Sequence, residues 1–182
     1  MTDYKTFKKE YLNEWVDRSQ AARKAAEELA MKDVKTSLRD KYKPEGLVFD
    51  LDGHKVEFKA ENEKNLKDSE YNFFTWDEAI ACQKDGWRLL TKEELEALCN
   101  YPYEFDDNSK QGVFDKRLYL PAAGLCGRNG NVDYVGSDGW YWSSTPCGLG
   151  NAWYFSFDLD RVRMYSDLRR FGFSVRLVRD VK

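Results

Sequence analysis

The sequence predicts an α+β fold in which a helical segment, a β-hairpin and two short helices precede a run of antiparallel strands. Apolar residues recur at three- and four-residue steps between residues 3 and 42. Two Thr-x-x-Glu motifs mark helix starts near the middle of the chain. Short stretches of alternating apolar and polar residues occur in the last third. Because helical and strand-like stretches come in blocks, alternating βαβ units are not predicted.

Residues 1–43 are predicted to form a helical segment, separate from a domain at 44–182. Its apolar stripe begins with Tyr4, Phe7, Tyr11 and Trp15. The stripe does not keep one register, which predicts a break, and Pro44 marks the end of the helix. The segment either packs on its own domain or serves docking or oligomerisation, so a homo-oligomer formed through this helix is one expected assembly.

A β-hairpin and two capped helices are expected next. The hairpin, at 47–59, is predicted because β-forming runs flank Asp52-Gly53, a pair that suits a type I′ turn. A polar stretch at 60–72 is expected to be a loop. Each helix begins with a capping box, in which a threonine accepts from the third amide and a glutamate returns to the cap amide. The pairs are Thr75 with Glu78 and Thr91 with Glu94.

The last third is expected to be mostly strand. Strands are predicted at 117–121, 140–144, 152–158 and 173–178, with a Gly- and Asn-rich loop at 124–139. The stretch 152–158 alternates most clearly. One set of its side chains is expected to face the core: Trp153, Phe155 and Phe157. The other set is expected to face solvent: Tyr154, Ser156 and Asp158.

The bulk composition excludes several classes of function. The net charge is only -3 over 182 residues, so no nucleic-acid partner is expected. No apolar run approaches the roughly 20 residues that cross a bilayer, so no membrane insertion is expected. The N-terminus has no hydrophobic signal-peptide core. A soluble protein is therefore expected, either virion-associated or cytoplasmic.

No cofactor or metal site is predicted. Cys82, Cys99, Cys126 and Cys147 form no Cys-x-x-Cys pair and are expected to be free thiols, although a disulfide stays open. The single histidine, His54, has no neighbouring His or Cys that would indicate a zinc site. The Gly-x-Ser-x-Gly elbow of a hydrolase is also absent.

The second half of the chain resembles a known family. The string TWDEAIACQKDGWRLLTKEELEAL, followed by LYLPAAG, GWYWSSTP, NAWYFSF and GFSVRLVR, resembles the C-type lectin-like domains related to formylglycine-generating enzymes. The resemblance covers residues 73–179. Within that superfamily the chain is most similar to the variable proteins of diversity-generating retroelements of phages and bacteria. This implies a C-type lectin-like fold with antiparallel sheets and two short helices.

The resemblance also implies a non-enzymatic binding function. In such proteins adenine-directed mutagenesis rewrites a C-terminal segment, and a fixed scaffold displays the rewritten side chains on one ligand-binding surface. Here the variable region is expected at about 145–176. The partner implied is an unknown protein or glycan, such as a cell-surface receptor.

One compositional feature supports this interpretation. Randomised AAC or AAT codons encode neither Lys, Glu, Gln, Met nor Trp. Residues 117–181 contain no Lys, Glu or Gln, whereas Lys and Glu are frequent earlier in the chain. The gap begins before the expected variable region, so a strand-rich composition contributes to it.

Matching the motifs divides the segment into scaffold and display positions. The scaffold is expected to comprise Trp140, Trp142, Ser143, Ser144, Ala152, Trp153, Phe155, Phe157, Met164, Gly172, Ser174, Val175 and Arg176. The ligand-binding residues are expected to be Cys147, Gly148, Leu149, Gly150, Tyr154, Ser156, Asp158, Leu159, Asp160, Arg161, Arg163, Tyr165, Ser166, Asp167, Leu168, Arg170 and Phe171. Arg169 is assigned to neither group.

Two alternatives stay open. A formylglycine-generating-type oxidase would need two neighbouring cysteines to hold copper, and the cysteines here are far apart in sequence. A calcium-independent glycan-binding module would stack displayed aromatic rings on sugars. A calcium-dependent lectin is not favoured, because the Glu-Pro-Asn and Gln-Pro-Asp tripeptides are absent and turn chemistry explains Asp133 and Asp138.

Overall fold

The computed structural model describes residues 47–65 and 71–181. The helical segment predicted at 1–43 lies outside these residues. The described part contains two helices, α2 (Trp76–Ala81) and α3 (Lys92–Leu98). Its strands are β1 (Val48–Leu51), β2 (His54–Phe58), β3 (Tyr103–Asp106), β4 (Gln111–Phe114), β5 (Leu118–Pro121), β6 (Leu125–Cys126), β7 (Val132–Asp133), β8 (Gly139–Cys147), β9 (Asn151–Phe157), β10 (Val162–Leu168) and β11 (Val178–Asp180).

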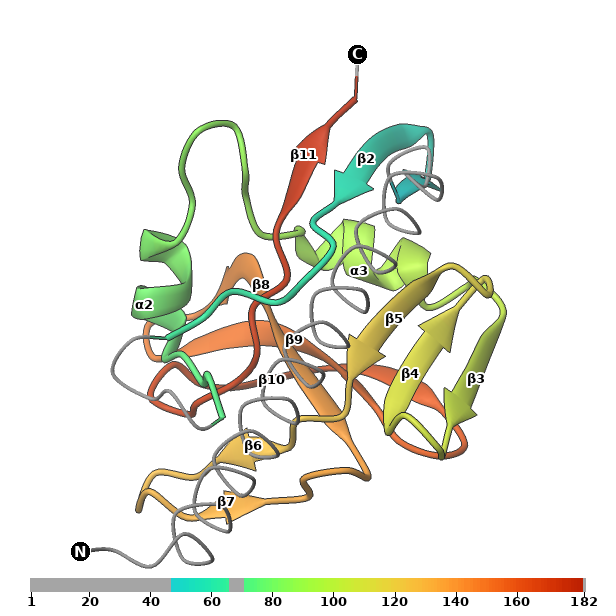
Figure 1. Cartoon of the computed structure of the whole chain (residues 1–182). Helices are drawn as coiled ribbons and strands as arrows, with labels where there is room; N and C mark the ends of the chain where they lie inside the picture. The colour runs from blue at the N-terminus through green and yellow to red at the C-terminus, as the bar shows by residue number, and fades with distance from the viewer. Residues whose placement is uncertain (1–46, 66–70, 182) are drawn as a thin grey trace, which may run out of the picture. The chain divides into compact units, whose positions relative to one another are not determined.

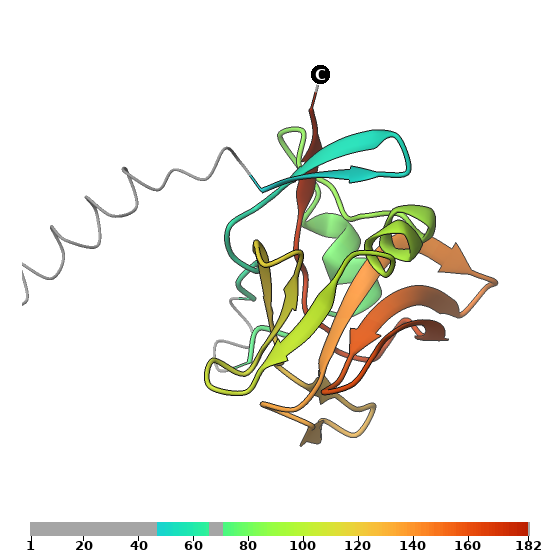
Figure 2. The ribbon, with the colours of Figure 1, turned by 90° about the vertical axis from the view of Figure 1, so that its right-hand side faces the viewer.

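These strands form four small sheets in the described residues, and every strand pair in them is antiparallel. The orders are β1-β2-β11, β3-β4-β5, β6-β7 and β10-β9-β8. Figures 1 and 2 place β1, β2 and β11 at one end and the β6-β7 ribbon at the other, with β8, β9 and β10 between them.

The predicted hairpin and both predicted capping boxes are confirmed. Asp52 and Gly53 have φ values of 58° and 84°, as a type I′ turn requires, and they join the paired strands β1 and β2. In α2 the Glu78 amide donates to Thr75, and in α3 the Glu94 amide donates to Thr91. Each glutamate also accepts from the amide of its threonine.

The β10-β9-β8 sheet separates two apolar clusters. Tyr141, Phe155 and Phe157 lie in the first core cluster, which also contains residues of the β1-β2 hairpin, α3 and the β3-β4-β5 sheet. Trp142 and Ala152 lie in the second core cluster, which also contains Phe74, Ala79, Leu89, Phe173, Val175 and Leu177. Both faces of this sheet are therefore packed over at least part of their area.

The predicted fold class is wrong. Antiparallel strands dominate the described residues, and the helical content is two short helices of six and seven residues. The described residues therefore form four small sheets packed around two apolar clusters, and not the predicted α+β domain with a C-type lectin-like arrangement.

Individual strand predictions also need correction. The chain forms β3, β4 and β10 where no strand was predicted, and β6 and β7 within the expected loop at 124–139. In the expected final strand at 173–178, Phe173 and Ser174 form isolated bridges, residues 175–177 belong to no strand, and the regular strand begins only at Val178. None of the described helices is long and apolar enough to cross a membrane.

Candidate functional site

Strand pairing sorts the side chains of the last sheet onto two faces. Trp142 pairs with Tyr154, and Tyr154 pairs with Tyr165. Because side chains alternate along a strand, the following residues share one face, called here the Tyr154 face: Trp140, Trp142, Tyr154, Ser156, Arg163, Tyr165 and Asp167. The opposite face carries Phe155 and Phe157 and packs on the first core cluster.

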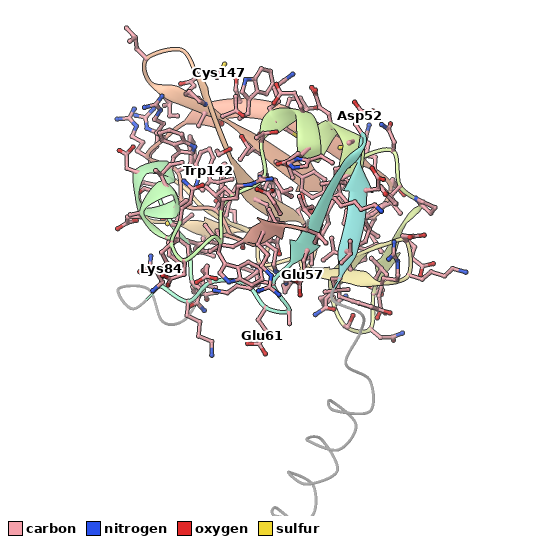
Figure 3. The ribbon with its side chains drawn as sticks, turned by 90° about the horizontal axis from the view of Figure 1, so that it is seen from above. Asp52, Glu57, Glu61, Lys84, Trp142 and Cys147 are labelled. Carbon is pink, nitrogen blue, oxygen red and sulfur yellow. The ribbon has the colours of Figure 1, made fainter. Side chains whose placement is uncertain are left out.

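Most of the predicted scaffold residues are buried. Trp142, Ser143, Ala152, Phe155, Phe157, Gly172, Ser174, Val175 and Arg176 are all less than a tenth exposed. Figure 3 shows Trp142 inside the body of the domain and Cys147 near its rim. Met164 packs against the first core cluster. Arg176 donates to Asn62 and to the backbone oxygens of Lys59, Ala60 and Tyr119.

Trp153, which was expected to face the core, is not fully buried. Its side chain is half-buried, and the Lys92 ammonium group lies over its ring at 4.9 Å from the centroid. Trp140 and Ser144 are also only half-buried. These three residues lie at the margins of the sheet's packing rather than in its centre.

The second core cluster covers part of the Tyr154 face. Phe173 lies 4.9 Å from the Tyr154 ring and 4.2 Å from the Trp142 ring, centroid to centroid. Tyr154 is consequently half-buried. Ser156, which lies on the same face, is only 8% exposed. Burial is the main cause that raises the pKa of the Tyr154 hydroxyl, followed by the nearby Asp167 carboxylate. The expected exposure to solvent is therefore wrong for Ser156 and only partly correct for Tyr154.

The two turns of this sheet carry the most exposed display positions. Gly148, Leu149 and Gly150 form the β8-β9 turn, in which Leu149 is fully exposed. Leu159, Asp160 and Arg161 form the exposed β9-β10 turn. Tyr165 and Arg170 are also exposed. The remaining display positions are half-buried: Cys147, Asp158, Arg163, Ser166, Asp167, Leu168 and Phe171.

A hollow of about 550 Å³ brings together display positions from two chain segments. It is lined by Thr75, Asp77, Leu149, Gly150, Leu168, Arg169 and Arg170. Arg169 lines this hollow and is held in place by its neighbours. Its guanidinium carbon lies 4.2 Å from the centroid of the Trp76 ring, and its nitrogens donate to the backbone oxygens of Asn151 and Gly148. Arg169, which the sequence left unassigned, therefore acts as scaffold.

Asp158 organises the charges at the other end of the sheet. One carboxylate oxygen accepts from the amides of Asp160 and Arg161, at 3.0 and 3.1 Å. The other lies 3.2 Å from an Arg163 nitrogen and 3.7 Å from Arg161. The Asp158 carboxylate therefore fixes the shape of the β9-β10 turn and neutralises the charge of two arginines.

Two exposed residues beside this face were not predicted from the sequence. Tyr134 is 59% exposed and Val135 is 54% exposed, and both follow β7. The Tyr134 ring lies 5.4 Å from the Trp140 ring, so they extend the apolar surface beyond residue 145. A pair of large apolar residues between Asn131 and Gly136 was the available signal, but the surrounding Gly and Asn residues pointed to an ordinary loop.

Comparison with known proteins finds one similarity, over part of the chain. Residues 104–178 match a domain of unknown function (DUF8237). The matched stretch runs from β3 to the start of β11 and includes all of β8, β9 and β10. Neither the curated proteins nor the solved structures contain a match to the chain.

A second polar cluster lies near α3. Among residues 47–65 and 71–181, His54, Glu94 and Asp180 are the one group of three whose ligand atoms lie close enough to hold a metal ion, within 4.8 Å of one another. Arg88 already binds both carboxylates, at 2.7 Å to Glu94 and 2.6 Å to Asp180. A metal ion would have to displace this guanidinium, so the cluster is better described as an ion-pair network.

This network shifts the pKa values of its members. Burial tends to raise the pKa of Glu94, but hydrogen bonds from Arg88, the Thr91 amide and His54 outweigh it, and the pKa is lowered overall. The hydrogen bond from Arg88 likewise lowers the pKa of Asp180. The side-chain hydrogen bond to Glu94 is the main cause that raises the pKa of Arg88.

All four cysteines are free thiols in the structure. Burial raises the pKa of Cys99 to about 11 and also raises that of Cys82. Since the thiolate is the reactive form and the metal ligand, these two positions are poor candidates for copper binding. The structure therefore offers no specific support for the oxidase alternative.

Proposed function

We propose that the protein is a non-enzymatic binding protein that recognises a ligand or receptor with the Tyr154 face and the two adjoining turns, and that a diversity-generating retroelement rewrites this surface. The role of the retroelement in this proposal rests on the resemblance of the C-terminal motifs to variable proteins. The packing of the sheet supports the binding surface.

One observation carries the proposal. The predicted scaffold positions are mostly buried, whereas among the predicted display positions only Ser156 is buried. A surface that is rewritten repeatedly must leave folding intact, so its variable side chains must contribute little to the core. The exposed turns at 148–150 and 159–161 meet this requirement best.

The side-chain types on this surface suit recognition. Tyrosine supplies a large contact area at a low cost in side-chain entropy, and arginine supplies several donors in one plane. Tyr154, Tyr165 and Arg163 occupy neighbouring positions on β9 and β10. Together with the turns they form a surface as long as the seven-residue strand β9, which is about 23 Å.

The retroelement is tested by sequencing the DNA that flanks the coding region. We expect a near-copy of codons 145–176 that differs mainly at adenines, beside a reverse transcriptase gene. A flanking region without such a copy would remove the retroelement from the proposal.

The display surface is tested by two codon libraries in the full chain, presented on yeast. The first randomises five exposed positions with the codons that adenine mutagenesis of AAC generates: Leu149, Leu159, Asp160, Arg161 and Tyr165. The matched control randomises five buried positions in the same way: Ser143, Ala152, Phe155, Phe157 and Val175.

We expect most members of the first library to resist protease as well as the parent protein does, and most members of the control library to be cleaved. Equal losses in the two libraries would mean that the exposed positions contribute to folding, and the display surface would be rejected.

A further inference from the structure

An aromatic row crosses the Tyr154 face and continues beyond the expected variable region. The ring centroids of Tyr134 and Trp140 are 5.4 Å apart, and those of Tyr154 and Tyr165 are 6.1 Å apart. Trp140 and Tyr154 lie diagonally across β8 and β9, because Trp140 pairs with Ser156 and Trp142 pairs with Tyr154. The row is exposed at its ends, where Tyr134 is 59% and Tyr165 is 48% accessible.

The backbone at Tyr134 takes a strained conformation, and its ring is exposed. Its φ of 62° is a left-handed conformation that a bulky side chain rarely adopts. The Tyr134 carbonyl accepts from the amides of Ser137 and Asp138 and from the Ser137 hydroxyl. Gly124 permits the close approach of this loop, because a Cβ there would lie 2.3 Å from the Asp133 oxygen. Strain that presents an exposed ring is typical of a binding position.

The charges beside the row are few and of both signs. Arg163 lies against Asp158, and Asp167 stands on the same face of the sheet. Such a surface has no strong field of either sign to attract an ionic ligand. It does offer tyrosine hydroxyls and guanidinium donors next to apolar rings. This combination suits a neutral ligand that is rich in hydroxyl groups and has C–H faces.

We infer that the aromatic row binds a neutral oligosaccharide without the help of a metal ion. Tyr134 and Trp140, which precede residue 145, supply constant stacking contacts, and Tyr154 and Tyr165 supply contacts that vary. The inference rests on the proposed function, because it names the ligand class of the same face.

The experiment measures tryptophan fluorescence of the full chain during titration with cello-, manno-, xylo- and chito-oligosaccharides in the presence of EDTA. Trp140 lies within the row and reports on its occupancy. The test variants are Tyr134→Ser and Tyr165→Ser. The matched control is Tyr119→Ser, because Tyr119 is 47% exposed and lies on β5, in another sheet.

We expect saturable binding of at least one oligosaccharide, weakened about tenfold or more by each test variant and unchanged in the control. Equal affinities in all three variants would overturn the inference. Binding that occurs without EDTA and is lost when EDTA is added would also overturn it. So would an array on which the protein binds glycan-free proteins and none of the oligosaccharides. If the exposed-position library folds while no oligosaccharide binds, the ligand class is wrong and the display surface stands.

Discussion

Tyr154 and Tyr165 face each other across β9 and β10 with ring centroids 6.1 Å apart, yet only one of them is part of the packing. The Tyr154 ring also lies 4.9 Å from Phe173 and belongs to the margin of the second core cluster. Tyr165 is 48% exposed and its neighbour along the strand, Met164, faces the opposite cluster. The pair therefore combines a packed ring and an exposed ring within one cross-strand contact.

Replacing these two tyrosines should affect stability differently. We expect Tyr165→Ala to lower the free energy of unfolding by less than about 1 kcal/mol, because little apolar area leaves the core. Tyr154→Ala should cost about 2 kcal/mol, because the ring is withdrawn from Phe173 and Trp142. Urea denaturation of the two variants measures both values, and equal losses would contradict the assignment.

Trp153 and Phe155 offer a second comparison, along one strand. Phe155 is fully buried, so Phe155→Ala should cost about 3–5 kcal/mol. Trp153 is half-buried and packs beneath Lys92, so Trp153→Ala should cost about 1–2 kcal/mol through lost area and the cation–π contact. Thermal and urea unfolding should rank the variants in this order. A larger loss for Trp153→Ala would show that its ring is part of the core.

Local signals in the sequence predicted local structure well. The turn at Asp52-Gly53 and the boxes at Thr75 and Thr91 depend on hydrogen bonds between residues that are close in sequence. These features were therefore predictable from a few residues.

Burial on the Tyr154 face was not predictable in the same way. Alternation correctly placed Phe155 and Phe157 in the core, but it also placed Tyr154 and Ser156 in water. The return of the chain through Phe173 covers that face, and Phe173 lies nearly 20 residues further along. A periodic pattern shows which residues share a face, but it does not show which distant segment will cover it. The strand β10 was missed because its polar residues hide the alternation of Val162 and Met164.

The Arg88 network should make the free energy of unfolding depend on pH in the acidic range. Glu94 and Asp180 both have a lowered pKa in the folded protein, so their contribution is present above the pKa of unfolded carboxyl groups, about 4. It is lost as the pH falls through the folded values. We expect the free energy of unfolding, measured in urea between pH 7 and 3, to fall on acidification.

Removing the guanidinium should weaken this dependence. Arg88→Met leaves the Glu94 carboxylate buried without its main partner, which should cost about 3 kcal/mol at pH 7. Burial would then favour the protonated acid, so less stability should be lost on acidification. The double variant Arg88→Met, Glu94→Met removes the unpaired charge and should recover part of the loss. An unchanged pH dependence in Arg88→Met would show that other groups cause it.

Gly139 should resist substitution because of the Phe157 ring. A Cβ at Gly139 would lie 2.3 Å from the ring, and one at Gly112 would lie 2.8 Å from it, so the ring is held between two glycines. Gly139 has no positive φ, so alanine would otherwise favour folding by restricting the unfolded chain. The steric clash is larger, and Gly139→Ala should cost about 1–3 kcal/mol. Gly150→Ala is the matched control, because its Cβ would meet no atom within 4 Å. A neutral Gly139→Ala variant in thermal unfolding would mean that Phe157 can move aside, and the sheet would then be packed less tightly than its register implies.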